Sequence, residues 1–111
     1  MQQPQPLTLE AFHRLIAETP AVLAYFSGEQ CAVCHALKPK IKKLLQEDFP
    51  QLRFFEIDSH QQPEIAGQLS VLSVPTIIIF VEGKEQSRFT RGFSISELAD
   101  NISRWYELFF S

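Results

Sequence analysis

The two cysteines of the chain, Cys31 and Cys34, are separated by two residues and lie between an apolar run and a helix-like stretch. The run Ala21–Phe26 has the length of a strand and carries no charge, which is typical of a strand covered on both faces in an α/β sheet. A strand that leads into Cys-x-x-Cys at a helix start is the arrangement that makes a reactive dithiol. The pattern therefore predicts an α/β fold organised around a reactive cysteine pair.

The position of the pair gives its two thiols different roles. The N-terminus of a helix presents free backbone N–H groups and a partial positive charge, and both stabilise a thiolate on Cys31. Helical geometry returns Cys34 to within bonding distance of Cys31. We therefore expect Cys34 to resolve a mixed disulfide that forms at Cys31.

Length and composition favour one domain. The chain has 111 residues, of which 45% are hydrophobic, and this is enough for one packed core. Residues 1–6 are polar and contain Pro4 and Pro6. We expect a flexible N-terminal tail over residues 1–6 and a single domain over residues 7–111.

Charge and hydropathy exclude two classes of partner. The net charge of −3 gives no general affinity for polyanions, so we expect no nucleic-acid partner. No apolar run approaches the roughly 20 residues that cross a bilayer, so we expect no membrane partner. The N-terminus lacks the basic and apolar regions of a signal peptide. We expect a cytoplasmic protein, where a lone cysteine pair is more often catalytic or metal-binding than structural.

Hydrophobic periodicity and turn residues predict the other elements. Thr8 is a suitable N-cap for the first helix, and Ser94 with Glu97 forms a capping-box pattern for the last. Glu82–Lys84 is typical of a hairpin turn. We predict helices over residues 9–18, 32–47, 63–69 and 95–109, and strands over residues 21–27, 52–57, 76–81 and 85–90. The order implies a parallel strand pair with a right-handed crossover, a hairpin in the same sheet, and helices on both faces.

The helix over residues 32–47 has an apolar side and a basic side. Its buried side is predicted to carry Val33, Leu37, Ile41, Leu44 and Leu45. Pro39 lies inside it and removes one backbone donor. Its lysines are Lys38, Lys40, Lys42 and Lys43. A solvated face explains them better than a basic docking face.

Four features together resemble the thioredoxin family. They are Cys31-Ala-Val-Cys34 after an apolar strand, Pro39 in the following helix, Val74-Pro75-Thr76 before the hairpin, and Gly92 before the last helix. Their order and spacing match the family from about residue 8 to residue 109. The resemblance implies a thioredoxin fold with a central mixed sheet of four or five strands flanked by helices.

The resemblance also implies a thiol–disulfide oxidoreductase that reduces protein disulfides. Cys31 would be the nucleophile and Cys34 the resolving thiol. A cis peptide between Val74 and Pro75 would lie against the dithiol and pair with an extended substrate segment. Gln30 and Gly92 would border the same groove. The implied partners are disulfide-containing proteins and an electron-donor reductase or small thiol, with no cofactor.

The chain departs from the family around the cysteines. Gln30 replaces the usual Trp and changes the surface that partners meet, and Ala32-Val33 replaces the usual Gly-Pro. Tyr25 stands where the family has a buried Asp that takes part in proton transfer for the resolving thiol. Phe54 stands where the family has the Lys that accompanies this Asp. Losing both residues is coherent, because either one alone would be buried and unpaired.

His35 and Glu56 are the candidates to replace that buried Asp as the base for Cys34. The competing interpretation is that both point to solvent, His35 from its helix and Glu56 from its strand.

Metal sites are weaker interpretations of the same cysteines. Cys31, Cys34 and His35 also match the Cys-x-x-Cys-His pattern of covalent haem attachment, but that requires an exported chain, and Met1 is the only methionine. The same three residues do not converge easily on a tetrahedral zinc ion, and no second Cys-x-x-Cys is present. An iron–sulfur cluster shared across a dimer is a further alternative. We predict no metal site.

Two questions stay open at the level of sequence. The fold could serve as a binding or chaperone-like module that uses the groove around Pro75, with a redox-sensing or vestigial dithiol. The apolar C-terminus Trp105–Phe110 either ends a core helix or exposes Phe110 for dimerisation. We expect a monomer or a weak dimer.

Overall fold

The computed structural model describes residues 7–111 and contains four helices and four strands in these residues. The tail predicted over residues 1–6 lies outside the described residues. In chain order the elements are α1 (Leu9–Glu18), β1 (Ala21–Ser27), α2 (Ala32–Asp48), β2 (Arg53–Asp58), α3 (Pro63–Gln68), β3 (Thr76–Val81), β4 (Lys84–Thr90) and α4 (Ile95–Phe110). Their order and type are those predicted from the sequence.

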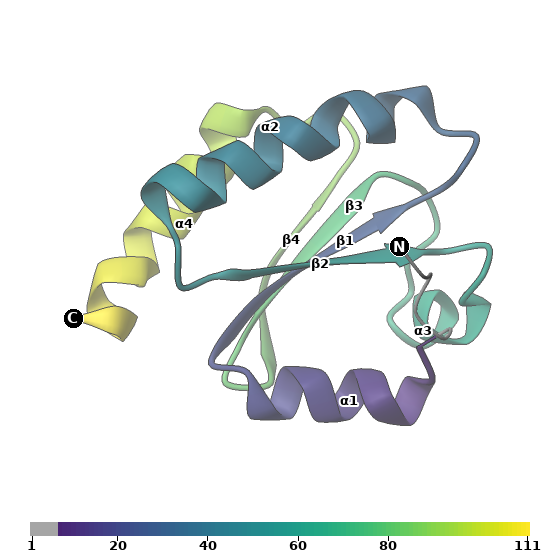
Figure 1. The fold of residues 1–111 in the computed structure, drawn as a ribbon, viewed down its shortest axis with the longest axis horizontal. Helices are drawn as coiled ribbons and strands as arrows, with labels where there is room; N and C mark the ends of the chain where they lie inside the picture. The colour runs from purple at the N-terminus through teal and green to yellow at the C-terminus, as the bar shows by residue number, and fades with distance from the viewer. Residues whose placement is uncertain (1–6) are drawn as a thin grey trace, which may run out of the picture.

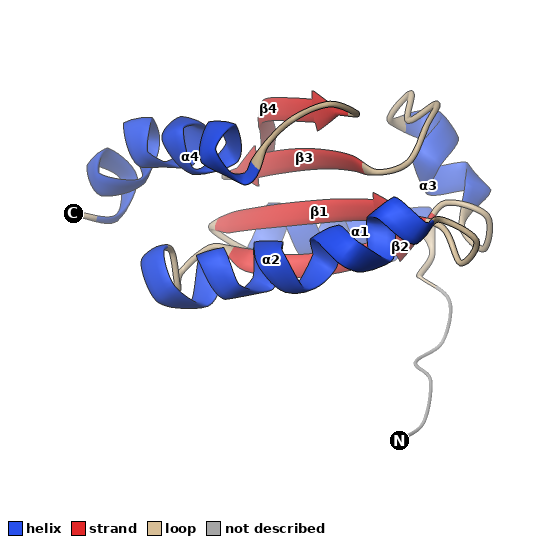
Figure 2. Ribbon diagram, turned by 90° about the horizontal axis from the view of Figure 1, so that it is seen from above, coloured by secondary structure: helices blue, strands red, loops and turns tan. Residues whose placement is uncertain are grey.

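The four strands form one mixed sheet in the order β2-β1-β3-β4. Strand β1 pairs with β2 in parallel and with β3 antiparallel, and β3 pairs antiparallel with β4. Figure 2 shows the strands in this order, with β4 at the top. Helices α2 and α4 cover one face of the sheet, and α1 and α3 cover the other (Figure 1). The predicted mixed sheet flanked by helices is therefore confirmed, with four strands.

Strand β1 is buried along its whole length because its side chains alternate between two cores. Leu23 and Tyr25 pack in the core beneath α2 and α4, whereas Ala24 and Phe26 pack in the core against α1 and α3. This alternation explains why the run is apolar at every position rather than at every second one. The position of β1 is fixed from both sides.

The helix and hairpin ends follow the predicted local chemistry. Thr8 caps α1 by accepting a hydrogen bond from the backbone N–H of Ala11 at 3.0 Å. The Ser94 hydroxyl accepts from the N–H of Glu97, and the Glu97 carboxylate accepts from the N–H of Ser94. The hairpin turn has positive φ at Glu82 and Gly83.

Among residues 7–111, no helix has the length and apolar character that a membrane crossing requires.

The expectation that Val33 is buried is wrong. Its side chain is 63% exposed, whereas the inward side of α2 is formed by Cys34, Ile41 and Leu45. Consecutive helical residues are about 100° apart around the axis, so Val33 points away from the side that Cys34 presents to the core.

The apolar C-terminus packs on the protein. Phe110 is half-buried and contacts the core beneath α2 and α4, with its ring centroid 4.8 Å from that of Tyr106. This arrangement favours the end of a core helix over an exposed Phe110. Leu108 is the exposed large apolar residue of this segment.

The strand register brings three connections to one edge of the sheet. Phe26 near the end of β1 pairs with Thr76 at the start of β3, and Thr76 pairs with Thr90 at the end of β4. The turn before α2, the segment before β3 and the loop after β4 therefore leave the sheet at the same edge. These connections carry the predicted site residues.

The capping box of α4 yields a stability prediction. Replacing Ser94 by Ala removes the acceptor for the Glu97 N–H, and we expect the free energy of unfolding to fall by about 1 kcal/mol. Urea unfolding measures this change. The matched control is Ser96→Ala, an exposed position in the same turn, for which we expect a change below about 0.5 kcal/mol. Equal losses in the two variants would contradict the capping role.

Candidate active site

Cys31 and Cys34 form a disulfide at the junction of β1 and α2. Cys31 is the N-cap residue of α2, and the Cα atoms of the pair are 5.2 Å apart. The two sulfur-bearing side chains differ in access, because Cys31 is half-buried and Cys34 is only 1% exposed. An incoming sulfur atom can therefore reach Cys31 far more easily than Cys34.

The backbone around Cys31 favours negative charge on its sulfur. The N–H of Cys34 points at the Cys31 Sγ, with N and Sγ 3.1 Å apart. This N–H is one of the groups at a helix N-terminus that have no partner within the helix. The turn before the helix is closed by a hydrogen bond from the N–H of Cys31 to the carbonyl of Gly28. The Cys34 N–H is a donor of the kind that stabilises a thiolate relative to a thiol.

The side chains of Val74 and Cys31 both lie next to Gly28. A Cβ placed on Gly28 would lie 3.7 Å from Cγ2 of Val74 and 4.0 Å from Cβ of Cys31, so both side chains border the same point. The peptide bond between Val74 and Pro75 is cis, which is the geometry that the resemblance implies. Pro75 itself is buried. The structure thus brings together the cysteines and the segment before β3.

The other two predicted groove residues are exposed at the same edge of the sheet. Gln30 lies in the turn before Cys31, and Gly92 lies in the loop after β4. Gly92 has a φ of +72°, a conformation that favours glycine, and a Cβ there would meet no atom within 4 Å. Gln30 directly precedes Cys31 in the chain, whereas Gly92 reaches this end of the sheet from β4.

Tyr25 contacts Cys34, a contact that was not predicted from the sequence. Its fully buried hydroxyl donates a hydrogen bond of 2.6 Å to the backbone carbonyl of Cys34. Burial, with a smaller contribution from the charge of Glu56, raises the pKa of Tyr25 to about 12, so the phenol stays protonated as a donor. A tyrosine within an apolar strand was the available signal, because a buried hydroxyl needs a partner.

Glu56 is exposed, as the competing interpretation expects, but its carboxylate also belongs to a polar cluster with Ser27 and Lys38. It is the register partner of Tyr25 in β2. Its carboxylate accepts a 2.7 Å hydrogen bond from the buried Ser27 hydroxyl and forms a 2.6 Å ion pair with Lys38 on α2.

Opposing effects set the pKa of the Glu56 carboxyl. Burial alone would raise it, but hydrogen bonds from Lys38 and Ser27, with the charges of Lys38 and His35, hold it below its usual value. The carboxylate therefore stays ionised at neutral pH.

His35 lies on the exposed side of α2 and faces the preceding turn. Its Nε2 is 2.9 Å from the carbonyl oxygen of Glu29. Phe54, at the position of the family's lysine, packs near Tyr25 with ring centroids 5.8 Å apart. Of the two candidates to replace the missing Asp, Glu56 therefore neighbours Tyr25, whereas His35 contacts the turn before the helix.

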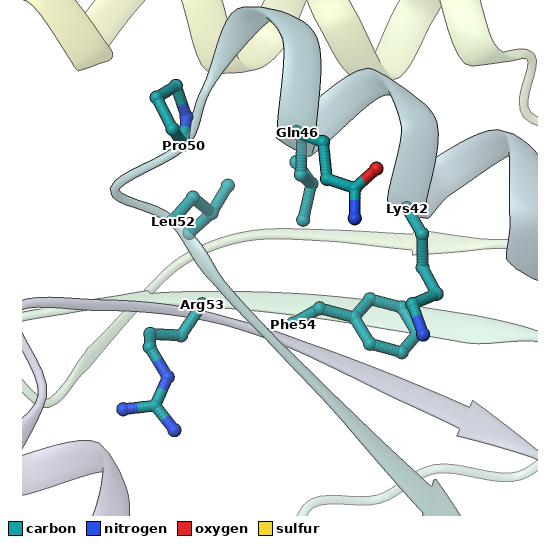
Figure 3. A pocket seen from close by; sticks show the side chains of 7 residues that line it. Lys42, Gln46, Pro50, Leu52, Arg53 and Phe54 are labelled. Atoms are coloured by element: carbon teal, nitrogen blue, oxygen red, sulfur yellow. The ribbon is translucent and has the colours of Figure 1, made fainter.

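The main pocket of the described residues lies apart from the disulfide. Within residues 7–111, no three His, Cys, Asp or Glu side chains are grouped to hold a metal ion. A pocket of about 330 Å³ lies between the second half of α2 and the start of β2 (Figure 3). The Lys42 ammonium at this pocket lies 5.6 Å from the centroid of the Phe54 ring. Lys42 is about 12 Å along the helix axis from Cys34, so the pocket is separate from the disulfide.

Comparison with known proteins agrees with this geometry. The thioredoxin family model matches residues 3–104. A thioredoxin-like protein of Bacillus subtilis, YdfQ, is 29% identical over 102 residues, which cover 92% of this chain and 90% of that protein. Thioredoxin-1 of Saccharomyces cerevisiae is 30% identical over 81 residues, covering 73% and 78% of the two chains. Thioredoxin 1 of Thermosipho africanus superposes with a TM-score of 0.72 at 36% identity, covering 78% and 96%. The chain therefore belongs to the thioredoxin family.

Proposed function

We propose that this protein is a thiol–disulfide oxidoreductase that reduces protein disulfides through Cys31 and Cys34. One observation carries the proposal: the accessible Cys31 sulfur lies at a helix start and faces the N–H of Cys34, while the Cys34 sulfur is buried directly behind it. This asymmetry separates an attacking thiolate from a resolving thiol. It matches the two steps of thiol–disulfide exchange.

The reaction proceeds in two balanced steps. The Cys31 thiolate attacks one sulfur of the substrate disulfide, that bond breaks, and the other substrate sulfur leaves as a thiolate and takes up a proton. Cys34 then loses its proton, and its thiolate attacks the Cys31 sulfur of the mixed disulfide. The second substrate thiolate leaves, and the Cys31–Cys34 disulfide forms. Two electrons pass from the dithiol to the substrate.

The protein substrate would dock at the sheet edge that carries Gln30, Val74, Pro75 and Gly92. Two apolar side chains near this edge are unusually exposed, Val33 at 63% and Leu72 at 94%. These two exposed side chains support a substrate that has apolar residues near its disulfide. The substrate segment would be extended and would lie along the backbone at Val74 and Pro75. Gln30 presents an amide to the partner where most family members present an indole.

The proposed cycle also needs a reductant and a reducing compartment. A reductase or a small thiol would return the Cys31–Cys34 disulfide to the dithiol. We place this cycle in the cytoplasm, because thiols are kept reduced there. A monomer suffices for the chemistry, since both cysteines come from one chain.

Single replacements of the two cysteines separate their roles. We expect Cys31→Ser to abolish insulin reduction because the attacking thiolate is gone. We expect Cys34→Ser to accumulate mixed disulfides with protein substrates, visible on non-reducing gels, because nothing resolves them. The double variant is the control and should trap none. Full insulin reduction by Cys31→Ser would overturn the proposed mechanism.

The titration of Cys31 distinguishes catalysis from a binding module with a vestigial dithiol. In the reduced protein we expect its thiol pKa to lie below the free value of about 8.5, because the helix N-terminus and the Cys34 N–H stabilise the thiolate. Thiolate absorbance of the wild type, compared with Cys31→Ser, measures it. A value at or above about 8.5 would favour the binding module.

A further inference from the structure

The segment that carries Val74 and Pro75 is held at its beginning by Arg88. This segment covers residues 69–75, between α3 and β3, and leads to the sheet edge where β1 ends (Figure 1). The Nη1 atom of Arg88, in β4, donates to the carbonyl of Leu69 at 2.8 Å and lies 3.5 Å from the carbonyl of Ser70. These carbonyls belong to the C-terminal end of α3, where a cation is favourable.

Glu85 holds the guanidinium in place. Arg88 Nε donates to Oε2 of Glu85 at 2.8 Å, and Nη2 donates to Oε1 at 2.9 Å. This bidentate contact fixes the plane of the guanidinium and leaves Nη1 directed at the segment. Arg88 is half-buried, in an edge strand that contains neither cysteine. Arg88 therefore contacts the segment over residues 69–75 and acts on it rather than on the dithiol.

The backbone that Arg88 contacts is strained. Ser70 has a φ of +57°, a left-handed conformation that is unfavourable for a residue with a side chain. At the other end of the segment, the buried Thr76 hydroxyl donates to the carbonyl of Ser73 at 2.8 Å. Leu72 lies between these two anchors and is almost fully exposed. The segment is thus fixed at both ends and presents an apolar side chain to solvent.

We infer that Arg88, oriented by Glu85, is a positioning residue that holds residues 69–75 in the shape that receives an extended segment of a protein substrate. The inference rests on the proposed function, since the same segment carries Val74 and Pro75. Loosening the segment weakens docking of a protein substrate. It leaves the reactivity of the sulfur atoms unchanged, because Cys31 caps the start of α2 and its donor, the N–H of Cys34, lies in the first turn of that helix. A disulfide too small to contact the segment is therefore insensitive to Arg88.

The test compares Arg88→Gln with wild type on two disulfides in single-turnover reactions of the pre-reduced protein. With insulin, we expect the half-saturating concentration to rise about fivefold at an unchanged maximal rate, as for the loss of one hydrogen-bonding group. With dithiobis-nitrobenzoate, we expect the rate to stay within about twofold of wild type. The matched control is Arg104→Gln, which removes an exposed arginine on α4 and should change neither reaction.

A second variant and a second measurement separate positioning from stability. Glu85→Gln keeps Arg88 but removes the carboxylate that orients its guanidinium. We expect the half-saturating insulin concentration to rise less in this variant than in Arg88→Gln. Glu85→Gln provides the test if Arg88→Gln does not fold. The reduction potential of the cysteine pair should not change in either variant. Equal effects on both disulfides, or no effect on insulin, would overturn the role of Arg88. If the wild type reduces neither disulfide, the proposed function fails and the inference fails with it.

Discussion

Burial of β1 on both faces is the constraint on which the site depends. Its side chains alternate between two cores, and its backbone pairs with β2 on one side and β3 on the other. The chain leaves the end of this strand and reaches Cys31 at the start of α2, where the Cys31 sulfur faces the N–H of Cys34. The same strand contains Tyr25, whose hydroxyl donates a hydrogen bond to the carbonyl of Cys34. The difference in exposure between the two cysteines follows from this junction, and the proposed division of roles follows from that difference.

The ionisable groups near the disulfide lie where their charges can be paired. Tyr25 and Phe54 fill the positions of the family's buried acid and base, and neither is charged at neutral pH. The charged pair is instead Lys38 with Glu56, whose side chains are 38% and 32% exposed. A partly exposed pair avoids the cost of an isolated charge in the core. Cys34 therefore meets a neutral phenol at its backbone, and the proposed chemistry depends on the thiolate character of Cys31 and on the nearness of Cys34.

Local patterns predicted the elements, whereas contacts between distant residues were not predictable. Periodicity and capping residues located all the helices and strands, because these signals are short-range. Val33 was misplaced, because an apolar residue in the first turn of a helix need not face the core. The bond from Tyr25 to Cys34 and the contact of Arg88 with Leu69 join residues that lie 9 and 19 positions apart. No spacing rule identifies such pairs, since they arise from how separate helices, strands and loops pack together in the fold.

The most direct test of the account is the reduction potential of the Cys31–Cys34 pair, measured by equilibration in glutathione and dithiothreitol buffers. A cytosolic reductant requires an intramolecular disulfide that exchanges two electrons near the thioredoxin value of about −270 mV, and this is the result that the account predicts. A value near about −120 mV would contradict the reducing direction and indicate an oxidant. Failure to form any intramolecular disulfide would contradict the oxidoreductase function itself and leave the binding module as the better explanation.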